Sequence, residues 1–447
     1  MLRAVRVIAA IGLCAGAAPA HAGQATCSNP GLPVGAAASS DLMPGRLTLG
    51  LTTALLPVTT EQLLQDGAAP IRYDATLMLV ETRLSAEYAV RPWLAVGLAL
   101  PYRVVDVSVT YLDPASGGEV PPGTAGIHAR DETLRGVGDP SVAVHVAREL
   151  GAYRLHARAG TSIPFGSTVE DPFALGDIGQ EHEHIQLGTG TFVPFVAGEL
   201  QRSVAGVTGA VWGIANLSLY ENAHGFRSSH RLSGGLSAST GLGTRAWTFG
   251  AAAEVHAETA ERWHGMVYAD EGNAGRDDVL AGVNVAWRPM RGLAMIADVK
   301  LPVYEHVTGA QLDYGVVAGI GLVSTFDLAP RASWHGLDEA TLGTAGTAPR
   351  LAPVAGRITV FDLWAAWCAP CRELDAKLVA LARRYPDRIA VRKLDVVDND
   401  SAAWTTYLAP GGFSLPHVKV YRDDGSLVFE RTASPDELVR AIEQALR

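Results

Sequence analysis

Two cysteines separated by two residues are the most reactive grouping in this 447-residue sequence. They are Cys368 and Cys371 in the stretch "DLWAAWCAPCREL", residues 362–374. Such a pair can alternate between dithiol and disulfide, because one thiolate attacks a disulfide and the second cysteine resolves the mixed disulfide. A static disulfide is an alternative, as is half of a zinc site, but zinc takes about four ligands and only His417 is a nearby candidate. The pair therefore predicts thiol–disulfide exchange, with the Cys368–Cys371 disulfide itself in place of a cofactor.

The flanking residues predict the elements that position this pair. A buried strand is expected over "ITVFDLWAA" and an amphipathic helix over "CRELDAKLVALARRY". Cys368 then lies at the helix N-terminus, where unpaired backbone N–H groups and the helix dipole favour the thiolate. Cys368 is the expected nucleophile and Cys371 the resolving cysteine. Pro370 falls in the first turn, where its missing N–H has no cost.

From about residue 350 to the end, the sequence resembles the thioredoxin family. The residues that carry the resemblance are "WCAPC" at 367–371, Asp362, "KLDV" from Lys393, and "SLPHVKVY" with Pro416. The resemblance implies an α/β thioredoxin-like fold and thiol–disulfide oxidoreductase activity. It also implies that Asp362 is a buried carboxylate that helps take the proton from Cys371, with Lys393 as its partner.

The same resemblance assigns the remaining site residues. Trp367 is expected to cover the cysteines, and Pro416 to be a cis-proline at which the chain from Leu415 to His417 meets a bound substrate strand. The sequence departs from the common family pattern twice, with Ala369 in place of a glycine and His417 in place of a threonine-like residue. The first departure leaves the redox direction open. His417 either stabilises a thiolate or faces solvent, and both readings stay open.

The chain before this domain differs in its glycine content and in its pattern of apolar and polar residues. Glycine occurs 44 times in residues 1–355 and 4 times afterwards, and apolar residues alternate with polar ones from about residue 46 to residue 328. In 279–288, for example, Val279, Val283 and Trp287 share one face, and Asn284 and Arg288 the other. Twelve strands are predicted, near 45–57, 75–89, 93–111, 139–150, 153–165, 187–200, 206–221, 228–241, 246–258, 277–289, 293–304 and 313–328.

Three features make this part resemble bacterial outer-membrane β-barrels. Many of the strands reach about ten residues, the length that a tilted strand needs to cross a bilayer. Aromatic residues such as Tyr314 and Phe326 stand at the ends of apolar faces. Mostly long polar loops follow the odd-numbered strands, and tight turns follow the others. The resemblance predicts an antiparallel transmembrane β-barrel over 45–328, with both of its ends in the periplasm.

The polar faces of these strands predict charges inside the barrel. The inward residues are expected to be Glu81, Arg83, Glu87, Arg154, His156, Arg158, Glu254, His256, Glu258, Asp298 and Lys300. A barrel filled by ion pairs and a narrow polar pore both fit, since twelve strands lie between filled and open barrels. His182 and His184, two apart in a loop, could share a metal ion, but no second cluster lies nearby. A solvated polar loop is the favoured reading there.

The remaining segments complete the organisation. Residues 1–22 read as a signal peptide, 23–44 as an N-terminal periplasmic segment with the odd thiol Cys27, 329–355 as a linker and 356–447 as the thioredoxin-like domain. The net charge of -10 and the absence of basic clusters argue against nucleic-acid binding.

The sequence as a whole predicts a thiol–disulfide oxidoreductase anchored in the outer membrane, with its C-terminal domain in the periplasm. Its expected partners are periplasmic or outer-membrane protein thiols and disulfides and a periplasmic electron donor, and the reducing direction is slightly favoured. The alternative is an outer-membrane pore or transporter for a small solute or a metal, with an accessory thioredoxin-like domain.

Overall fold

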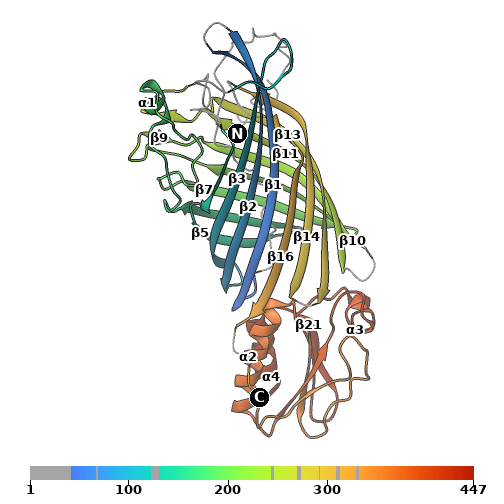
Figure 1. The fold of residues 1–447 in the computed structure, drawn as a ribbon. Helices are drawn as coiled ribbons and strands as arrows, with labels where there is room; N and C mark the ends of the chain where they lie inside the picture. The colour runs from blue at the N-terminus through green and yellow to red at the C-terminus, as the bar shows by residue number, and fades with distance from the viewer. Residues whose placement is uncertain are drawn as a thin grey trace, which may run out of the picture.

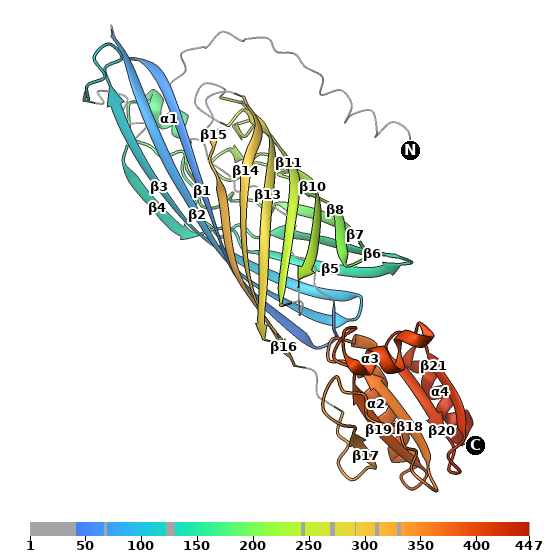
Figure 2. The same cartoon turned by 90° about the vertical axis from the view of Figure 1, so that its right-hand side faces the viewer.

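The computed structural model describes residues 42–446, apart from 67–68, 122–129, 243–245, 269–272, 291, 309–312 and 329–331. The predicted signal peptide and Cys27 lie outside the described residues. The described chain forms a β-barrel followed by a smaller α/β domain, which lies beyond one end of the barrel in both views (Figures 1 and 2). No helix in the described ranges is long and apolar enough to cross a membrane.

Twelve long antiparallel strands close into the barrel, as predicted. Closure occurs at β1, which pairs with β2 on one side and with β16 on the other. Within the described residues, two further strands, β4 and β15, add to the wall beside β3 and β1. The wall consists of β1 (Arg46–Asp66), β2 (Ala69–Arg91), β3 (Leu94–Leu112), β4 (Glu132–Val137), β5 (Ser141–Leu150), β6 (Tyr153–Ser162), β7 (Pro194–Val204), β8 (Val207–Asn216), β10 (Arg231–Leu242), β11 (Trp247–Thr259), β13 (Gly275–Met290), β14 (Leu293–Val307), β15 (Asp313–Tyr314) and β16 (Val317–Asp327).

The first connection differs from the prediction of a long polar loop at 58–74. Strands β1 and β2 instead continue as one hairpin as far as the pair Asp66 and Ala69. An antiparallel ladder satisfies the backbone N–H and C=O groups whatever the polarity of the side chains, so polar residues there did not end the strands. The longer loops hold short elements of their own: α1 (Pro172–Asp177), and β9 (Phe226–Arg227) paired with β12 (Arg262–Trp263).

The outer face of the barrel is apolar. On β13 and β14 the side chains of Val283, Leu301 and Val303 are exposed, while alternate residues between them are more covered. Exposed aromatic residues mark both ends of the strands. Trp247, Trp287 and Phe326 lie at the end nearest the C-terminal domain, and Phe165, Phe192 and Tyr304 at the other. An apolar band between two aromatic girdles is typical of a barrel wall that contacts lipid.

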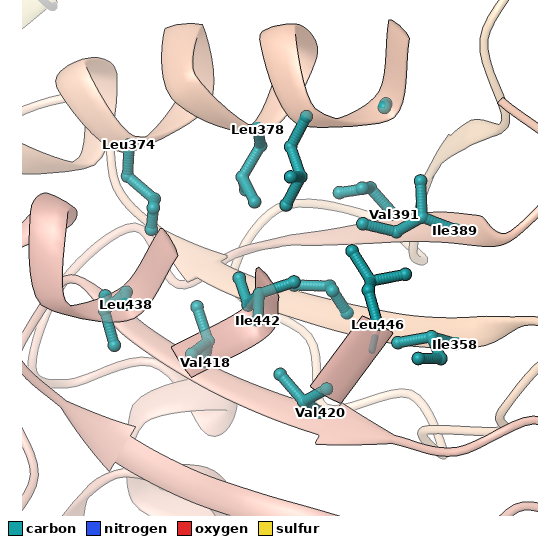
Figure 3. Packing of buried hydrophobic residues seen from close by; sticks show 13 residues of the cluster. Ile358, Leu374, Leu378, Ile389, Val391, Val418, Val420, Leu438, Ile442 and Leu446 are labelled. Carbon is teal, nitrogen blue, oxygen red and sulfur yellow. The ribbon is translucent and has the colours of Figure 1, made fainter. Parts of the chain in front are cut away.

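The C-terminal domain is a five-stranded sheet with helices on both faces. The strand order is β17 (Glu339–Thr341), β19 (Ile389–Asp395), β18 (Ile358–Trp364), β20 (His417–Tyr421) and β21 (Leu427–Thr432). The first three strands are parallel, and β20 and β21 run antiparallel to their neighbours. Helices α2 (Ala369–Arg384) and α4 (Pro435–Leu446) pack on one face through leucine, isoleucine and valine side chains (Figure 3). On the other face lie α3 (Ala402–Tyr407) and the short η2 (Ala409–Gly411).

The packed C-terminal domain begins earlier than predicted. Strand β17 falls within 329–355, the segment assigned to a linker, and pairs with β19. Trp334 and Leu337 pack against the core under α2. Gly and Pro residues in this segment indicated a linker, but three residues of extended chain are enough to add an edge strand to a parallel sheet.

Candidate redox site

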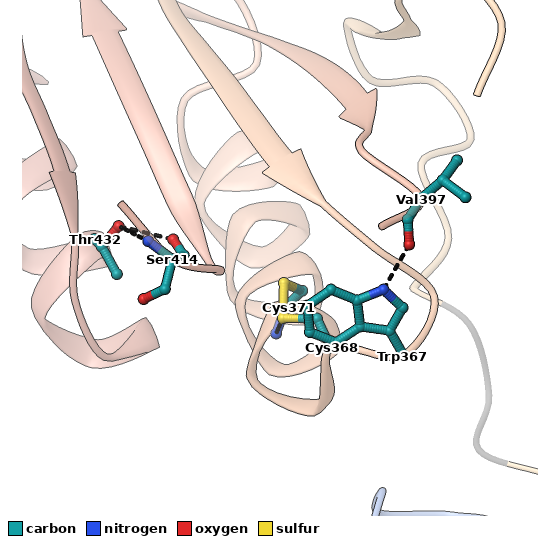
Figure 4. Close-up of a disulfide and its surroundings, with 6 residues drawn as sticks. All are labelled: Trp367, Cys368, Cys371, Val397, Ser414 and Thr432. Atoms are coloured by element: carbon teal, nitrogen blue, oxygen red, sulfur yellow. Dashed lines mark hydrogen bonds between the residues drawn. A yellow bond between two sulfur atoms is a disulfide. The ribbon is translucent and has the colours of Figure 1, made fainter. Parts of the chain in front are cut away.

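The cysteine pair lies where the sequence places it, at the start of α2. Cys368 is the residue that caps the helix, and its Sγ accepts a hydrogen bond from the Cys371 backbone N–H at 3.1 Å. Pro370 occupies the first turn. The two cysteines form a disulfide with their Cα atoms 5.3 Å apart (Figure 4). An N–H group directed at Sγ stabilises negative charge on that sulfur once the disulfide is reduced, which favours Cys368 as the thiolate.

The cysteine pair is buried next to a partly exposed tryptophan. Cys368 and Cys371 are buried, while the side chain of Trp367 is 45% exposed. The Trp367 indole lies beside the disulfide and donates a hydrogen bond from Nε1 to the Val397 carbonyl oxygen at 2.5 Å (Figure 4). This bond holds the indole ring in place beside the cysteine pair.

Leu415 and Pro416 lie beside the cysteines. Leu415 packs against the small cluster formed by Ala365, Cys368 and Cys371. The Leu415–Pro416 peptide bond is cis, as the family resemblance implies. Ser414, the residue before Leu415, forms two backbone hydrogen bonds with the Thr432 hydroxyl (Figure 4). The Ser414 N–H donates to Thr432 Oγ1, and that hydroxyl donates to the Ser414 carbonyl oxygen. The sequence did not predict these hydrogen bonds, because nothing in the residue pattern pairs residue 414 with residue 432.

His417 does not face solvent, which was one of the two roles considered for it, and its stabilising a thiolate stays a prediction. Its side chain is fully buried and hydrogen-bonds to Thr432 Oγ1 at 3.0 Å and to Glu430 Oε1 at 3.1 Å. Burial lowers the pKa of His417, although Glu430 opposes that shift. The ring therefore faces β21 and not solvent, and its hydrogen bonds to Thr432 and Glu430 both go to that strand.

Asp362 is a buried carboxyl group, as expected. Within the described residues neither of its oxygens has a hydrogen-bond partner. Burial raises its pKa to about 7, with the positive charge of Lys393 opposing the shift and the negative charge of Asp375 adding to it. A group with this pKa can both accept and return a proton near neutral pH.

Lys393 lies opposite Asp362 in the β18–β19 ladder, but its ammonium group bonds elsewhere. Its Nζ donates to Asp375 Oδ1 at 2.5 Å. Lys393 therefore acts on Asp362 through its charge, not through a hydrogen bond. Sequence reasoning missed Asp375. The available signal was a carboxylate one turn after Cys371, next to the core residue Leu374, on the helix face that meets the sheet.

Inside the barrel, charged side chains pair with one another. Glu81 accepts from Arg83 at 2.6 Å and from Arg103 at 2.8 Å, and Lys300 donates to Glu254 at 2.8 Å. The ring of the buried His145 lies 3.1 Å from Glu87 and 3.0 Å from the ring of His156. The inward orientation predicted for these faces is confirmed, and pairing offsets part of the cost of burying the charges.

The loop between β6 and β7 enters the barrel, which the sequence did not predict. Ile185 packs in an apolar cluster with inward-facing residues of the wall: Leu56, Val58, Leu77, Leu79, Val105, Val107, Tyr314 and Val317. Asp139 holds both ends of the loop, since its carboxylate accepts from the backbone N–H groups of Phe165, Gly166 and Thr189.

His182 and His184 lie in this loop and are buried, so the expectation of a solvated polar loop was wrong. The reason is that the loop folds back into the barrel. Their rings are 5.0 Å apart, and His184 meets Phe173 edge-on. In the part of the chain that the structure describes, no group of three or more His, Cys, Asp or Glu residues is arranged to hold a metal ion.

Comparisons with known proteins agree with this division of the chain. The family model described as Thioredoxin matches residues 353–444. A thioredoxin of Geodia cydonium is 31% identical over 71 residues, 16% of this chain and 62% of that protein. A thioredoxin of Staphylococcus aureus is 33% identical over 70 residues, 16% of this chain and 64% of that protein. Thioredoxin-1 of Drosophila melanogaster is 36% identical over 47 residues, 10% of this chain and 44% of that protein. The chain thus spans less than two thirds of the length of these relatives.

Solved structures resemble each part separately. The crystal structure of an outer membrane channel from Pseudomonas putida F1 aligns with a TM-score of 0.45 and 11% identity, covering 65% of this chain and all of that one. Oxidized thioredoxin O2 from Arabidopsis thaliana aligns with a TM-score of 0.17 and 24% identity, over 21% of this chain and 77% of that one. The chain is a twelve-stranded antiparallel β-barrel followed by a C-terminal α/β domain, and residues 353–444 of that domain match the Thioredoxin family model.

Proposed function

We propose that this protein is a thiol–disulfide oxidoreductase anchored in the outer membrane, with its thioredoxin domain in the periplasm and the reducing direction favoured. The observation that carries the proposal is the Cys368–Cys371 pair at the start of α2, with the Cys371 N–H directed at Cys368 Sγ. Protein disulfides of the envelope are the proposed substrates. A periplasmic dithiol carrier is the proposed electron donor.

The exchange runs in two steps. The Cys368 thiolate attacks one sulfur of a substrate disulfide, which forms a mixed disulfide and releases the other substrate sulfur as a thiolate. Cys371 then loses its proton to Asp362 and attacks Cys368, which forms the Cys368–Cys371 disulfide and releases the second substrate sulfur. Two electrons pass from the dithiol to the substrate. The periplasmic donor returns two electrons and two protons to complete the cycle.

The barrel serves in this proposal as an anchor. Its outer face suits lipid, while paired charges and the β6–β7 loop occupy its interior. An even number of strands brings both ends of the barrel to one side, so the domain after β16 remains on the side of the short turns. In an outer membrane that side is the periplasm.

Trapping tests the proposed exchange. In a Cys371→Ala variant the first step proceeds and the second cannot, so partners remain attached to Cys368 through mixed disulfides. Adducts that dithiothreitol releases should appear in envelope extracts of this variant. They should be absent from the matched Cys368→Ala, Cys371→Ala double variant, which excludes attachment through Cys27. Failure to recover such adducts would rule the exchange out, and the identity of a trapped partner would give the direction.

A further inference from the structure

A carboxylate outside the family pattern, Asp375, binds the lysine that faces Asp362. Asp375 follows Cys371 by four residues on α2, so the two lie on one face of the helix about one turn apart. Its Oδ1 accepts from Lys393 Nζ at 2.5 Å and from Trp334 Nε1 at 2.9 Å. Two donors on one oxygen hold the Asp375 side chain in place.

Asp362, Lys393 and Asp375 lie on the same side of the sheet. Val360 of β18 and Val391 of β19 belong to the core cluster under α2 and α4. Side chains two apart on a strand point the same way, so Asp362 and Lys393 also face α2. The strands place these two residues opposite each other, and the helix above them supplies Asp375.

The Lys393 ammonium group bonds to the helix residue Asp375 and makes no hydrogen bond with Asp362. Besides bonding to Asp375, its Nζ lies 5.0 Å from the ring centre of Trp364 and 5.9 Å from that of Trp334. Such contacts attract a cation. Meanwhile both oxygens of the fully buried Asp362 lack a hydrogen-bond partner among the described residues. A buried carboxyl group in this position responds strongly to any movement of the lysine, because little water screens the charges.

We propose that Asp375 is a positioning residue of the redox site: it holds the Lys393 ammonium group on the helix side and so keeps Asp362 able to accept and return the proton of Cys371. The proposal rests on the thiol–disulfide exchange proposed above. Without the Asp375 charge, Lys393 is free to turn toward Asp362 and stabilise its carboxylate. Asp362 then binds a proton more weakly and is a poorer base for the Cys371 thiol.

A bond forms between Cys371 Sγ and Cys368 Sγ, and the bond between Cys368 Sγ and the substrate sulfur breaks. The electron pair of the broken bond leaves on the substrate thiolate. The proton of Cys371 passes to Asp362 and then to that thiolate. Asp375 takes no part in the electron transfer and changes only the affinity of Asp362 for this proton.

Infrared titration of the full-length protein in detergent micelles tests the proposal directly. The protonated carboxyl band of Asp362 is identified as the band lost in an Asp362→Asn variant, and its intensity is followed against pH. In Asp375→Asn its midpoint should fall by about one to two pH units. The matched control is Glu373→Gln, which removes the same charge from an exposed position on α2 and should leave the midpoint unchanged. An Asp375→Asn midpoint equal to that of the control would overturn the proposal.

Two further variants keep the test decisive if Asp375→Asn does not fold. Asp375→Glu keeps the charge and should retain the wild-type midpoint, whereas Lys393→Gln removes the ammonium group and should raise it. A Lys393→Gln midpoint no higher than wild type overturns the proposal. The pH profile of insulin disulfide reduction in a single turnover should shift in the same direction as the band. If the wild-type protein reduces no insulin disulfide, the proposed function fails, while the infrared titration still decides the role of Asp375.

Discussion

Arg372, the residue directly after the second cysteine, forms an ion pair with Asp327 at the end of the last barrel strand, with Nη2 and Oδ2 2.5 Å apart. The other carboxylate oxygen of Asp327 accepts from Nε of Arg46 at 3.2 Å, across the β1–β16 pairing that closes the barrel. One carboxylate thus connects the closing seam of the barrel to the helix that carries the cysteines.

Replacing Arg372 with glutamine should loosen the contact between the two domains. A partly exposed ion pair contributes about 0.2–1 kcal/mol, so the population in which the domains are apart should rise by no more than roughly fivefold. Distances between spin labels attached through non-cysteine chemistry at the exposed residues Ala152 and Gln444 measure this, and their distribution should broaden. Arg384→Gln breaks a pair inside the C-terminal domain and is the matched control. Equal broadening in both variants would exclude a specific role for Arg372.

The buried carboxyl group of Asp362 should make the C-terminal domain less stable as the pH rises. Its pKa is about 7 in the folded domain against 3.8 for an ordinary aspartate. Below about pH 4 both states bind the proton, and between about pH 4 and 7 only the folded state does so. The stabilisation from the protonated group is therefore complete at low pH and is lost as the pH rises through the folded pKa. Above pH 7 the cost of ionising the buried group reaches up to about 4 kcal/mol.

Asp362→Asn should remove this pH dependence. The variant should match the wild-type protein near pH 4 and exceed it by up to about 4 kcal/mol at pH 8. Hydrogen exchange of the β19 peptide, which pairs with β18 and is identical in both proteins, measures the difference, because comparison of the same peptide at one pH cancels intrinsic exchange rates. Asp387→Asn, at an exposed position beyond α2, should leave exchange unchanged. A constant difference between Asp362→Asn and wild type at all pH values would contradict the assignment.

Residue patterns predicted the barrel because each wall strand has one face toward the outside of the barrel and one face toward its interior. Alternation in 279–288 placed Val283 outside and Asn284 inside, and the structure agrees. The residue pattern did not predict that part of the barrel interior is apolar. Leu56 and Val58 face inward there and pack against Ile185, which belongs to a loop far away in the sequence. Period-two patterns report which residues share a face, but not what covers that face.

At the redox site, local positions were predictable and long-range partners were not. Cys368 at the helix start follows from a strand, a short turn and a helix in sequence. The bond from Lys393 to Asp375 depends on how α2 crosses β19, and the contact of His417 with Glu430 depends on the register of β20 against β21. Residues adjacent in sequence to Lys393 or to His417 determine neither the crossing of α2 over β19 nor the register of β20 against β21.

Opening the barrel tests whether the β6–β7 loop closes it. Ile185→Asn places an amide in the apolar cluster, where an unsatisfied polar group costs on the order of 1–3 kcal/mol, so the loop should leave the wall more often. Conductance in a planar bilayer should rise well above that of the wild-type protein. Ile178→Asn is the matched control, because Ile178 belongs to the same loop and is 67% exposed. A wild-type barrel that already conducts as well as Ile185→Asn would instead favour the transporter.

Replacing His417 with alanine should weaken the β20–β21 hairpin and leave the chemistry of Cys368 intact. The variant loses two partly buried hydrogen bonds, to Thr432 and Glu430, at a cost of about 1–3 kcal/mol. Hydrogen exchange in the β20 and β21 peptides should therefore accelerate, and the exposed His335→Ala control should not change it. Because the imidazole hydrogen-bonds to Thr432 and Glu430 on β21, the pH dependence of Cys368 alkylation should match wild type. A shift of that profile to higher pH would mean that His417 stabilises the thiolate after all.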